Sequence, residues 1–221
     1  QGIEYENPKD AVLITYYDKS TEKPTNAGKY AYDIKVVYEG NEYNTGINGM
    51  FEIKPKKISL QGIEAKNKKY DGNDIIELSK GELVGIEGKD KVSFSLPPIG
   101  KADSKNAGIK DVKIDEIELR GSKSKNYELI QPKKDDVKVE ISPLDINIKD
   151  LSAMDKEYDG NNKVKIQRGT LEGILNGDTV SAKIPEEGQA DDKNAGKHKV
   201  HIEKIKLEGK DAKNYNLIQP E

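Results

Sequence analysis

The residues Tyr70-Asp71-Gly72-Asn73 are the first place where side chains of chemical interest gather, and they recur as Tyr158-Asp159-Gly160-Asn161. Together with Asp74, the Asp71 carboxylate suggests a calcium loop. Such a loop needs six or more oxygen ligands, however, and the second copy has Asn162 in place of Asp74. Gly tolerates positive φ, and Asp accepts hydrogen bonds from its own backbone. We therefore expect two tight turns, each anchored in a core by its Tyr, and no metal.

The rest of the composition offers little for catalysis or cofactor binding. The 221 residues include no Cys and two His, so thiol chemistry and Cys-ligated zinc are excluded. His198 and His201 are three apart, which places them on opposite faces of a strand. No carboxylate pair with glycosidase-like surroundings stands out. We expect no enzyme activity and no cofactor.

Charge and hydropathy exclude two further classes of partner. The 37 basic and 40 acidic residues are spread evenly along the chain and give a net charge of -3. This balance gives no electrostatic reason to bind nucleic acid. No stretch approaches the roughly 18 uncharged apolar residues that a membrane-spanning helix needs, so membrane insertion is not expected.

Tyrosine is concentrated near the N-terminus. Rigid, amphipathic tyrosine rings could bind a glycan or a host protein if they were exposed. The alternative is that tyrosine fills the core of a segment that has little Phe and no Trp. Both interpretations stay open for the clustered residues Tyr5, Tyr16, Tyr17, Tyr30, Tyr32, Tyr38 and Tyr43.

The tripeptide Asn-Ala-Gly occurs three times, each time before a segment with strand-like alternation. It begins at Asn26, Asn106 and Asn194 and ends at Gly28, Gly108 and Gly196. Gly suits a left-handed position and Asn suits a turn, so we expect a corner that shapes the fold. Because Lys, Asn and acidic residues are abundant, a Lys–Asn isopeptide crosslink is a further alternative. It would require a Lys, an Asn and a carboxylate buried in contact.

A duplication with a period of 88 residues organises most of the chain. Across 62–132, 33 of 71 residues are identical to the residue 88 positions further on. Lys125-Asn126-Tyr127 recurs as Lys213-Asn214-Tyr215, and Leu129-Ile130-Gln131-Pro132 recurs as Leu217-Ile218-Gln219-Pro220. Internal repetition of this kind indicates tandem structural units.

Prolines mark the expected boundaries between these units. Pro55 and Pro143 are 88 residues apart and separate the last strand of one unit from the first strand of the next. We expect modules at 1–55, 56–143 and 144–221, each with its own small core. The counterpart of the strand 137–141 would fall beyond Glu221. We therefore expect either a fragment of a longer protein or a last module without that strand.

Apolar residues alternate with polar ones, as in Val92, Phe94 and Leu96, while Gly, Asn and Asp recur every eight to twelve residues. This pattern predicts an all-β fold of antiparallel sheets in small immunoglobulin-like β-sandwich modules, joined in an elongated array. The alternation loses phase at Asp115-Glu116 and at Glu203-Lys204, where we expect a bulge or a strand break.

On the Tyr-Asp-Gly-Asn, Asn-Ala-Gly and Asn-Tyr…Gln-Pro elements, the second and third modules resemble the YDG repeat of bacterial surface proteins. The first module, with Pro24 to Tyr30 and Phe51-Glu52-Ile53, is similar to the mostly-beta glycine-rich (MBG) repeats that often precede it. The resemblance implies immunoglobulin-like or similar β modules, found in tandem in large secreted or wall-attached adhesins. It implies no catalytic residues.

The function expected from this pattern is structural. Tandem modules with a mixed-charge exterior would form a stalk that displays another domain at the bacterial surface or in a secreted adhesin-like protein. The expected partners are neighbouring domains of the same longer chain, and the expected state is a monomer. The alternative is a glycan- or host-protein-binding module that uses the tyrosine-rich first module.

Overall fold

The computed structural model describes residues 11–220. Contacts between Cα atoms divide the chain into two compact units. The first unit comprises the residues up to Gly62 together with 81–96 and 116–132, and the second comprises 63–80, 97–115 and 133–221. We call the modules at 56–143 and 144–221 the second and third repeats. The second repeat therefore contributes residues to both units. Within the described residues, no helix has the length and apolar character needed to cross a membrane.

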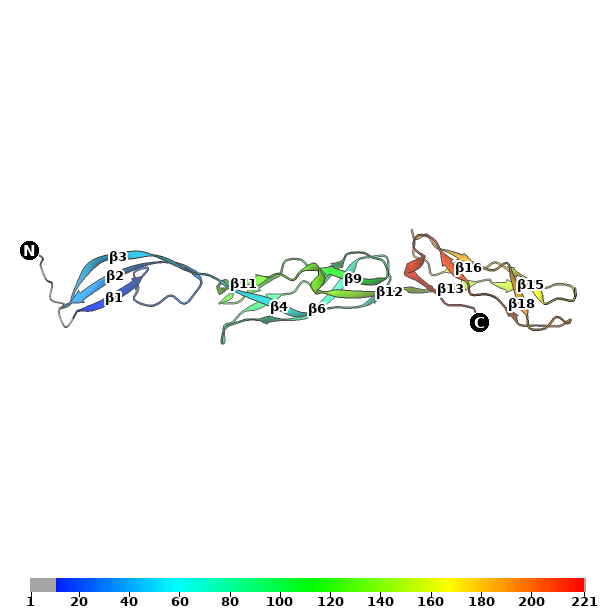
Figure 1. Ribbon diagram of the computed structural model, residues 1–221, viewed down its shortest axis with the longest axis horizontal. Coiled ribbons are helices and arrows are strands. Elements are labelled where there is room, and N and C mark those ends of the chain that lie inside the picture. Colours follow the sequence, from blue (N-terminus) through cyan, green and yellow to red (C-terminus); the bar gives the residue numbers. More distant parts are fainter. Residues whose placement is uncertain (1–10, 221) are drawn as a thin grey trace, which may run out of the picture. The chain divides into compact units, whose positions relative to one another are not determined.

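The N-terminal segment is one antiparallel sheet in the order β1-β2-β3 (Figure 1). Its strands are β1 (Val12–Tyr17), β2 (Gly28–Tyr38) and β3 (Asn41–Ile53). A register shift between Ile34 and Lys35 marks a bulge, where the Thr45 hydroxyl donates to the Ile34 carbonyl at 2.6 Å. None of the described residues 11–55 is buried. The expectation that this module has a core of its own is therefore wrong, because a single sheet leaves both of its faces open.

In the first unit, the second repeat contributes parallel and antiparallel strand pairs. Strand β11 pairs in parallel with the start of β4, and β7 pairs antiparallel with β10. Ile58, Leu60, Ile117 and Tyr127 form the buried core of this part. The elements concerned are β4 (Lys56–Ala65), β7 (Ser93–Ser95), β10 (Glu118–Arg120), the 3-10 helix η1 (Ser124–Asn126) and β11 (Tyr127–Ile130).

In the second unit, the same repeat contributes strands in the order β6-β8-β9-β12-β5. Alternate residues of β6 and β12 point inward, so that Ile76, Leu78, Val139 and Ile141 are buried together with Val112. The elements are β5 (Lys68–Lys69), β6 (Ile75–Val84), β8 (Ile99–Ala102), β9 (Gly108–Lys113), η2 (Lys134–Asp136) and β12 (Lys138–Ser142).

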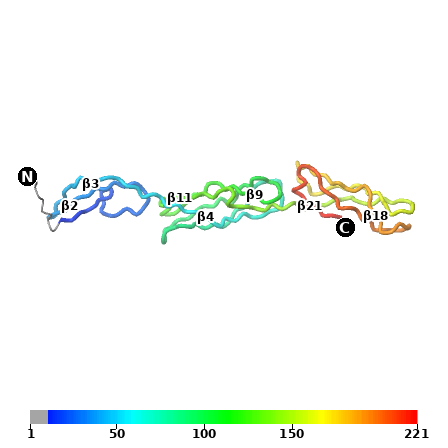
Figure 2. The backbone as a smooth tube through the Cα atoms, viewed as in Figure 1, coloured from blue at the N-terminus to red at the C-terminus, as the bar shows by residue number. Residues whose placement is uncertain are grey.

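The third repeat, also in the second unit, has three small sheets: β16-β13-β21, β14-β15-β18-β19 and β17-β20. Strand β21, which is labelled in Figure 2, pairs in parallel with β13. The elements are β13 (Leu144–Lys149), β14 (Ser152–Ala153), β15 (Lys163–Gln167), β16 (Thr170–Glu172), β17 (Ser181–Lys183), β18 (Glu187–Ala190), β19 (Val200–His201), β20 (Lys206–Glu208), η3 (Ala212–Asn214) and β21 (Tyr215–Leu217).

The all-β prediction is confirmed, with one correction. The parallel pairs β4–β11, β5–β12 and β13–β21 show that the sheets are mixed, whereas the alternation had indicated antiparallel sheets. A period of two reports which residues face the core but not which strand lies alongside.

Both predicted strand breaks are confirmed. Strand β9 ends at Lys113 and β10 begins at Glu118, and the corresponding gap in the third repeat lies between His201 and Lys206. Within each gap a glutamine side chain replaces the missing strand partner. Gln131 accepts from the Ile117 N–H at 3.0 Å and donates to the Ile117 carbonyl at 2.9 Å. Gln219 does the same for Ile205, at 2.9 and 3.0 Å.

Candidate functional site at the contacts between repeats

The Tyr-Asp-Gly-Asn segments are turns, as expected. In the second repeat the Asp71 carboxylate accepts from the Asn73 N–H at 3.1 Å, and the Asn73 side chain accepts from the Ile75 N–H at 2.9 Å. Gly72 has φ +81°, which a side chain would disfavour. Asp159, Gly160 and Asn161 build the same turn in the third repeat.

A lysine that precedes each turn fills the space where a cation would sit. Lys68 Nζ donates to both Asp71 carboxylate oxygens at 2.8 and 3.0 Å, to the Asn73 side chain at 2.8 Å, and to the carbonyls of Asn73 and Ile75. Lys156 donates to Asp159 and Asn161 in the same way. Among residues 11–220, no group of three or more His, Asp or Glu side chains is placed to hold a metal.

The ammonium groups also set the charge state of the turn carboxylates. Burial works to raise the pKa of Asp71, but the hydrogen bonds from Lys68 and the Asn73 backbone outweigh it and hold the pKa low. The hydrogen bond from Lys156 likewise lowers the pKa of Asp159. These turns bring a Lys, an Asn and a carboxylate into contact, as an isopeptide crosslink would require. The Asp71 side chain is 47% exposed, however, so the burial that this chemistry needs is missing.

Two asparagines of the Lys-Asn-Tyr segments each hold the Asn-Ala-Gly corner of the preceding module. Asn126 ends η1, and its side chain accepts from the Ala27 N–H at 2.7 Å and donates to the Asn26 side chain at 3.1 Å. Asn214 ends η3 and makes the same two contacts, at 2.9 Å with Ala107 and 3.1 Å with Asn106. We call each set of contacts an asparagine clasp.

In the clasp made by the third repeat, the asparagine itself is closed off from solvent. Asn214 is 3% exposed, and among the described polar and charged residues it alone is buried. Gly108, which has φ +117°, directly follows Ala107 and begins β9. The Asn-Ala-Gly tripeptide thus presents a main-chain N–H to the following repeat while it starts a strand of its own.

An aspartate and two tyrosines lie beside the second clasp. The Tyr70 hydroxyl donates to the Asp178 carboxylate at 2.9 Å, and the Tyr215 hydroxyl donates to it at 2.5 Å. The two rings meet edge to face with centroids 5.6 Å apart. Lys105 Nζ lies 4.0 Å from Asp178. Tyr70, 1% exposed, is therefore buried partly by the next repeat, a role that its sequence context did not reveal.

These contacts shift the pKa values of all three groups in the directions expected when two tyrosine hydroxyls donate to one carboxylate. Hydrogen bonds from Tyr215 and Tyr70 lower the pKa of Asp178 despite burial. Burial and the hydrogen bond to Asp178 raise the pKa of Tyr215 to about 12 and shift that of Tyr70 upward as well. In the second repeat, Tyr127 donates to Asp90 at 2.7 Å, which is the counterpart of the Tyr215–Asp178 pair.

The outer turns of the third repeat lack these contacts with a following repeat in the described chain. Tyr158 is 65% exposed, so the expectation that it anchors its turn in a core is wrong. The Asn194 side chain donates instead to Asp192 at 3.0 Å. His198 lies 2.7 Å from the Asn194 carbonyl and 3.1 Å from Asp191, while His201 is exposed. Gly196 follows the corner, as Gly108 does.

The tyrosines of the first segment divide between the two faces of its sheet. Tyr17, Tyr30 and Tyr32 surround Phe51, with ring centroids 5.9, 5.6 and 6.4 Å from it. All three rings pack around Phe51 and do not form an open platform. Tyr38 is half-buried, and Tyr5 lies outside the described residues.

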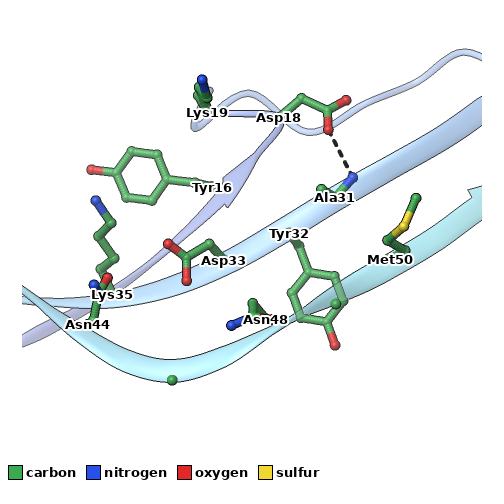
Figure 3. A pocket seen from close by; sticks show the side chains of 12 residues that line it. Tyr16, Asp18, Lys19, Ala31, Tyr32, Asp33, Lys35, Asn44, Asn48 and Met50 are labelled. Carbon is green, nitrogen blue, oxygen red and sulfur yellow. Dashed lines mark hydrogen bonds between the residues drawn. The ribbon is translucent and has the colours of Figure 1, made fainter.

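Tyr16 points to the opposite face, away from Tyr32 (Figure 3). It donates to Glu42, and Lys35 Nζ lies 5.0 Å from the centre of its ring and 2.8 Å from Glu42. Tyr16 and Lys35 line a shallow hollow, to which Tyr32, Asn44 and Met50 also contribute. Tyr43 is 51% exposed elsewhere on the sheet. The structure therefore does not bring the six described candidate tyrosines together on one surface.

The residues that our interpretation of the sequence missed are Lys68, Asp90 and their counterparts Lys156 and Asp178. Each pair is identical at the 88-residue spacing, which was a usable signal. Their roles could not be deduced from the repetition alone. Identity at this spacing does not distinguish Lys68, which holds a turn of its own repeat, from Asp178, which accepts a hydrogen bond from Tyr70 of the neighbouring repeat.

Comparison with known proteins agrees with this repetition. The family model of the YDG domain matches residues 54–135 and again residues 142–221. Searches of curated proteins and of solved structures found no match. The two family matches cover well over half of the sequence and include the turns, the clasp asparagines and the Asp–Tyr pairs described above. The chain therefore belongs to the YDG domain family and carries two tandem copies of the domain.

Proposed function

We propose that this chain is a non-catalytic structural segment of a bacterial cell-surface or secreted adhesin-like protein, in which tandem repeats act as a stalk for another domain. The observation that carries the proposal is the recurrence of the asparagine clasp. Asn126 and Asn214 make the same pair of contacts with successive Asn-Ala-Gly corners. A contact repeated from one repeat to the next is what a spacer of defined geometry needs.

The chemistry of the clasp suits this role. A side-chain amide that both accepts from an N–H and donates to a carbonyl-type oxygen fixes orientation better than an apolar contact does. Removing one partner of such a buried pair leaves the other unsatisfied, which costs about 1–3 kcal/mol. Neighbouring repeats joined in this way resist bending at their junction.

Distance measurements between spin labels can test this stiffness. The chain has no Cys, so cysteines introduced at exposed Ser79 and Thr170 would label the second and third repeats specifically. We expect a narrow distance distribution in the parent chain and a broad one after Asn214→Ala. Asn147→Ala, at an exposed position of β13, is the matched control.

Labels at Ser79 and Glu140, both within the second repeat, show whether the substitution disturbs the fold itself. An unchanged distribution between Ser79 and Thr170 in the Asn214→Ala variant would refute the stalk mechanism. The proposed location has its own test, since antibodies against the chain should label intact cells of the bacterium that encodes it, or its culture medium.

A further inference from the structure

Asn is followed directly by Gly at two places in the chain, Asn48-Gly49 and Asn176-Gly177. In such a dipeptide the glycine main-chain nitrogen can attack the asparagine side-chain amide, because glycine has no Cβ to hinder the approach. The attack forms a cyclic imide and releases ammonia, and water then opens the imide. The reaction is fast only where the fold leaves both residues exposed and able to rotate.

Asn176 and Gly177 occupy the centre of an exposed turn between β16 and β17. The Asp178 N–H donates to the Leu175 carbonyl at 3.2 Å and closes the turn. Gly177 has φ +91°, at the position where a type II turn favours glycine. Within residues 11–220, no hydrogen bond holds the Asn176 side chain or the Gly177 N–H. Both reacting groups are therefore open to water.

The dipeptide Asn48-Gly49 is restrained by the sheet of the first segment. Both residues lie inside β3, where they pair with Asp33 and Tyr32 of β2. A Cβ at Gly49 would lie 2.9 Å from the Tyr32 ring, so a side chain also covers this glycine. Ring closure requires the main chain to rotate at the asparagine, and the hydrogen bonds between paired strands oppose that rotation. Asn176 is therefore the more reactive of the two asparagines.

The same exposed turn contacts the second repeat. The Tyr215 hydroxyl holds both ends of the turn, because it accepts from the Leu175 N–H at 3.0 Å and donates to the Asp178 carboxylate at 2.5 Å. Asp178 also accepts from Tyr70 of the second repeat. The Leu175 side chain lies 3.4 Å from where a Cβ at Gly72 would be. The path of this turn thus determines how the third repeat meets the Tyr-Asp-Gly-Asn turn of the second.

We propose that Asn176 is a site of spontaneous deamidation and that its conversion loosens the contact between the second and third repeats. The Gly177 nitrogen gives its proton to water or hydroxide and forms a bond to Asn176 Cγ. The bond from Cγ to the side-chain nitrogen breaks, and ammonia leaves. Water then opens the cyclic imide. Opening at the main-chain carbonyl leaves isoaspartate, and opening at Cγ leaves aspartate. No oxidant or reductant is needed.

Conversion changes the turn in two ways. Both products add a negative charge two positions before Asp178, whose carboxylate side chain is only 7% exposed, and like charges close together repel. Isoaspartate also adds one carbon to the main chain between Leu175 and Asp178, so that one Tyr215 hydroxyl no longer reaches both. The hydrogen bond from Tyr70 to Asp178 weakens as a result. This modification goes beyond the proposed stalk function and does not involve the asparagine clasps.

The second repeat has a similar turn without the reactive dipeptide. Gly88-Lys89 stands at the positions that correspond to Asn176-Gly177. The Tyr127 hydroxyl accepts from the Glu87 N–H at 3.0 Å and donates to Asp90 at 2.7 Å, as Tyr215 does in the third repeat. This turn has no side-chain amide to lose, so it is an internal control within the same chain.

The first experiment incubates the full 221-residue chain at mildly alkaline pH and maps its peptides by mass spectrometry. The peptide that contains Asn176 should gain about one dalton and separate into two forms, one of which is a substrate for isoaspartate methyltransferase. Asn176 should lose half of its amide before Asn48 loses a detectable amount. Asn176→Gln should abolish the modification. A synthetic peptide with the sequence of 172–180 gives the rate of the unrestrained reaction.

The second experiment measures hydrogen exchange in the converted chain by NMR. The Leu175 N–H should exchange several-fold faster than in the fresh chain, whereas the Glu87 N–H of the second repeat should keep its rate. Asn176→Asp carries the added charge without the longer main chain, so it should show a smaller increase at Leu175.

An unconverted Asn176 at a time when the synthetic peptide has converted would overturn the proposed site, as would conversion of Asn48 first. Exchange of the Leu175 N–H at its original rate in the converted chain would overturn the proposed loosening. Equal acceleration at Glu87 would show general unfolding and would overturn it too. None of these outcomes bears on the spin-label test of the stalk, which uses the fresh chain.

Discussion

Side chains that hydrogen-bond to main-chain groups give each repeat its specific shape. Lys68 holds the Tyr-Asp-Gly-Asn turn, Gln131 bridges the strand break, and Asn126 clasps the preceding corner. Each of these residues satisfies backbone groups that the short strands leave unpaired. The chain thereby builds defined modules from only 33% hydrophobic residues.

The site around Asp178 predicts a pH dependence at both ends of the scale. The pKa of Asp178 is lower in the folded chain than in the unfolded chain, so its contribution to stability is present above the unfolded value and is lost as the pH falls through the folded value. The pKa of Tyr215 is raised to about 12, so its contribution is complete below about 10 and is lost as the pH rises toward 12.

Chemical denaturation at a series of pH values measures the free energy of unfolding, and tyrosinate absorbance follows the tyrosines at high pH. The loss of stability at low pH, the acid arm, should be smaller in Asp178→Asn than in the parent chain. The loss at high pH should be smaller in Tyr215→Phe. Asp150→Asn is the matched acidic control, because Asp150 is an exposed carboxylate beyond β13. An acid arm that is the same in the parent chain and in Asp178→Asn would contradict the assignment.

Residue types in the sequence predicted the turns but not the contacts between repeats. Gly72 and Asp71 carry a local signal, since positive φ and a side chain that accepts from its own backbone are properties of the tetrapeptide alone. Asn214 and Asp178 carry no such signal, because their partners Ala107 and Tyr70 are more than 100 positions away along the chain. Their identity at the 88-residue spacing marked them as important without saying why.

At the scale of elements, the strand positions followed from alternation and the strand partners did not. The loss of phase at Asp115-Glu116 located the break between β9 and β10 correctly. The parallel pairing of β4 with β11 joins segments that lie far apart in the sequence, and nothing in their pattern of apolar residues distinguishes a parallel from an antiparallel neighbour.

Gly209, which follows β20, is predicted to be essential to the local path of the chain. It has φ +117°, and an added Cβ would lie 2.4 Å from the Thr179 carbonyl oxygen. Gly121 meets Lys91 in the same way in the second repeat. Gly209→Ala should therefore lower the free energy of unfolding by on the order of 2–3 kcal/mol.

Gly177→Ala provides the comparison in urea unfolding. Gly177 has φ +91° but no atom lies within 4 Å of its added Cβ, so this variant loses only the conformational preference of about 1 kcal/mol. Equal losses for the two variants would mean that the contact with Thr179 is unimportant.

At the scale of the whole molecule, the repeats depend on one another to different degrees. The 88-residue duplication and the family matches agree on two related domains, and the all-β class was predictable from the alternation. The sequence did not reveal that the first segment lacks buried residues, because its alternating tyrosines and valines look like those of a strand with a covered face.

The first segment is therefore expected to fold poorly without the repeat that follows it. A single sheet needs a covered apolar face for independent stability. A fragment of residues 1–55 should show no cooperative thermal transition by circular dichroism and rapid hydrogen exchange over β1 to β3. The same strands should exchange more slowly in the full chain. A cooperative transition of the isolated fragment would show that this dependence does not exist.

The oxygen cage around Lys68 and Lys156 affects how the chain reacts with acylating reagents. Each of these ammonium groups donates hydrogen bonds to carboxylate, amide and carbonyl oxygens, and the two lysine side chains are only 18% and 28% exposed, so a reagent reaches the amines only when these hydrogen bonds open. Lys66 and Lys80, by comparison, are 69% and 66% exposed, and each donates to a single carboxylate. In footprinting by mass spectrometry, the two caged amines would serve as slow internal standards, one reporting the integrity of each YDG domain.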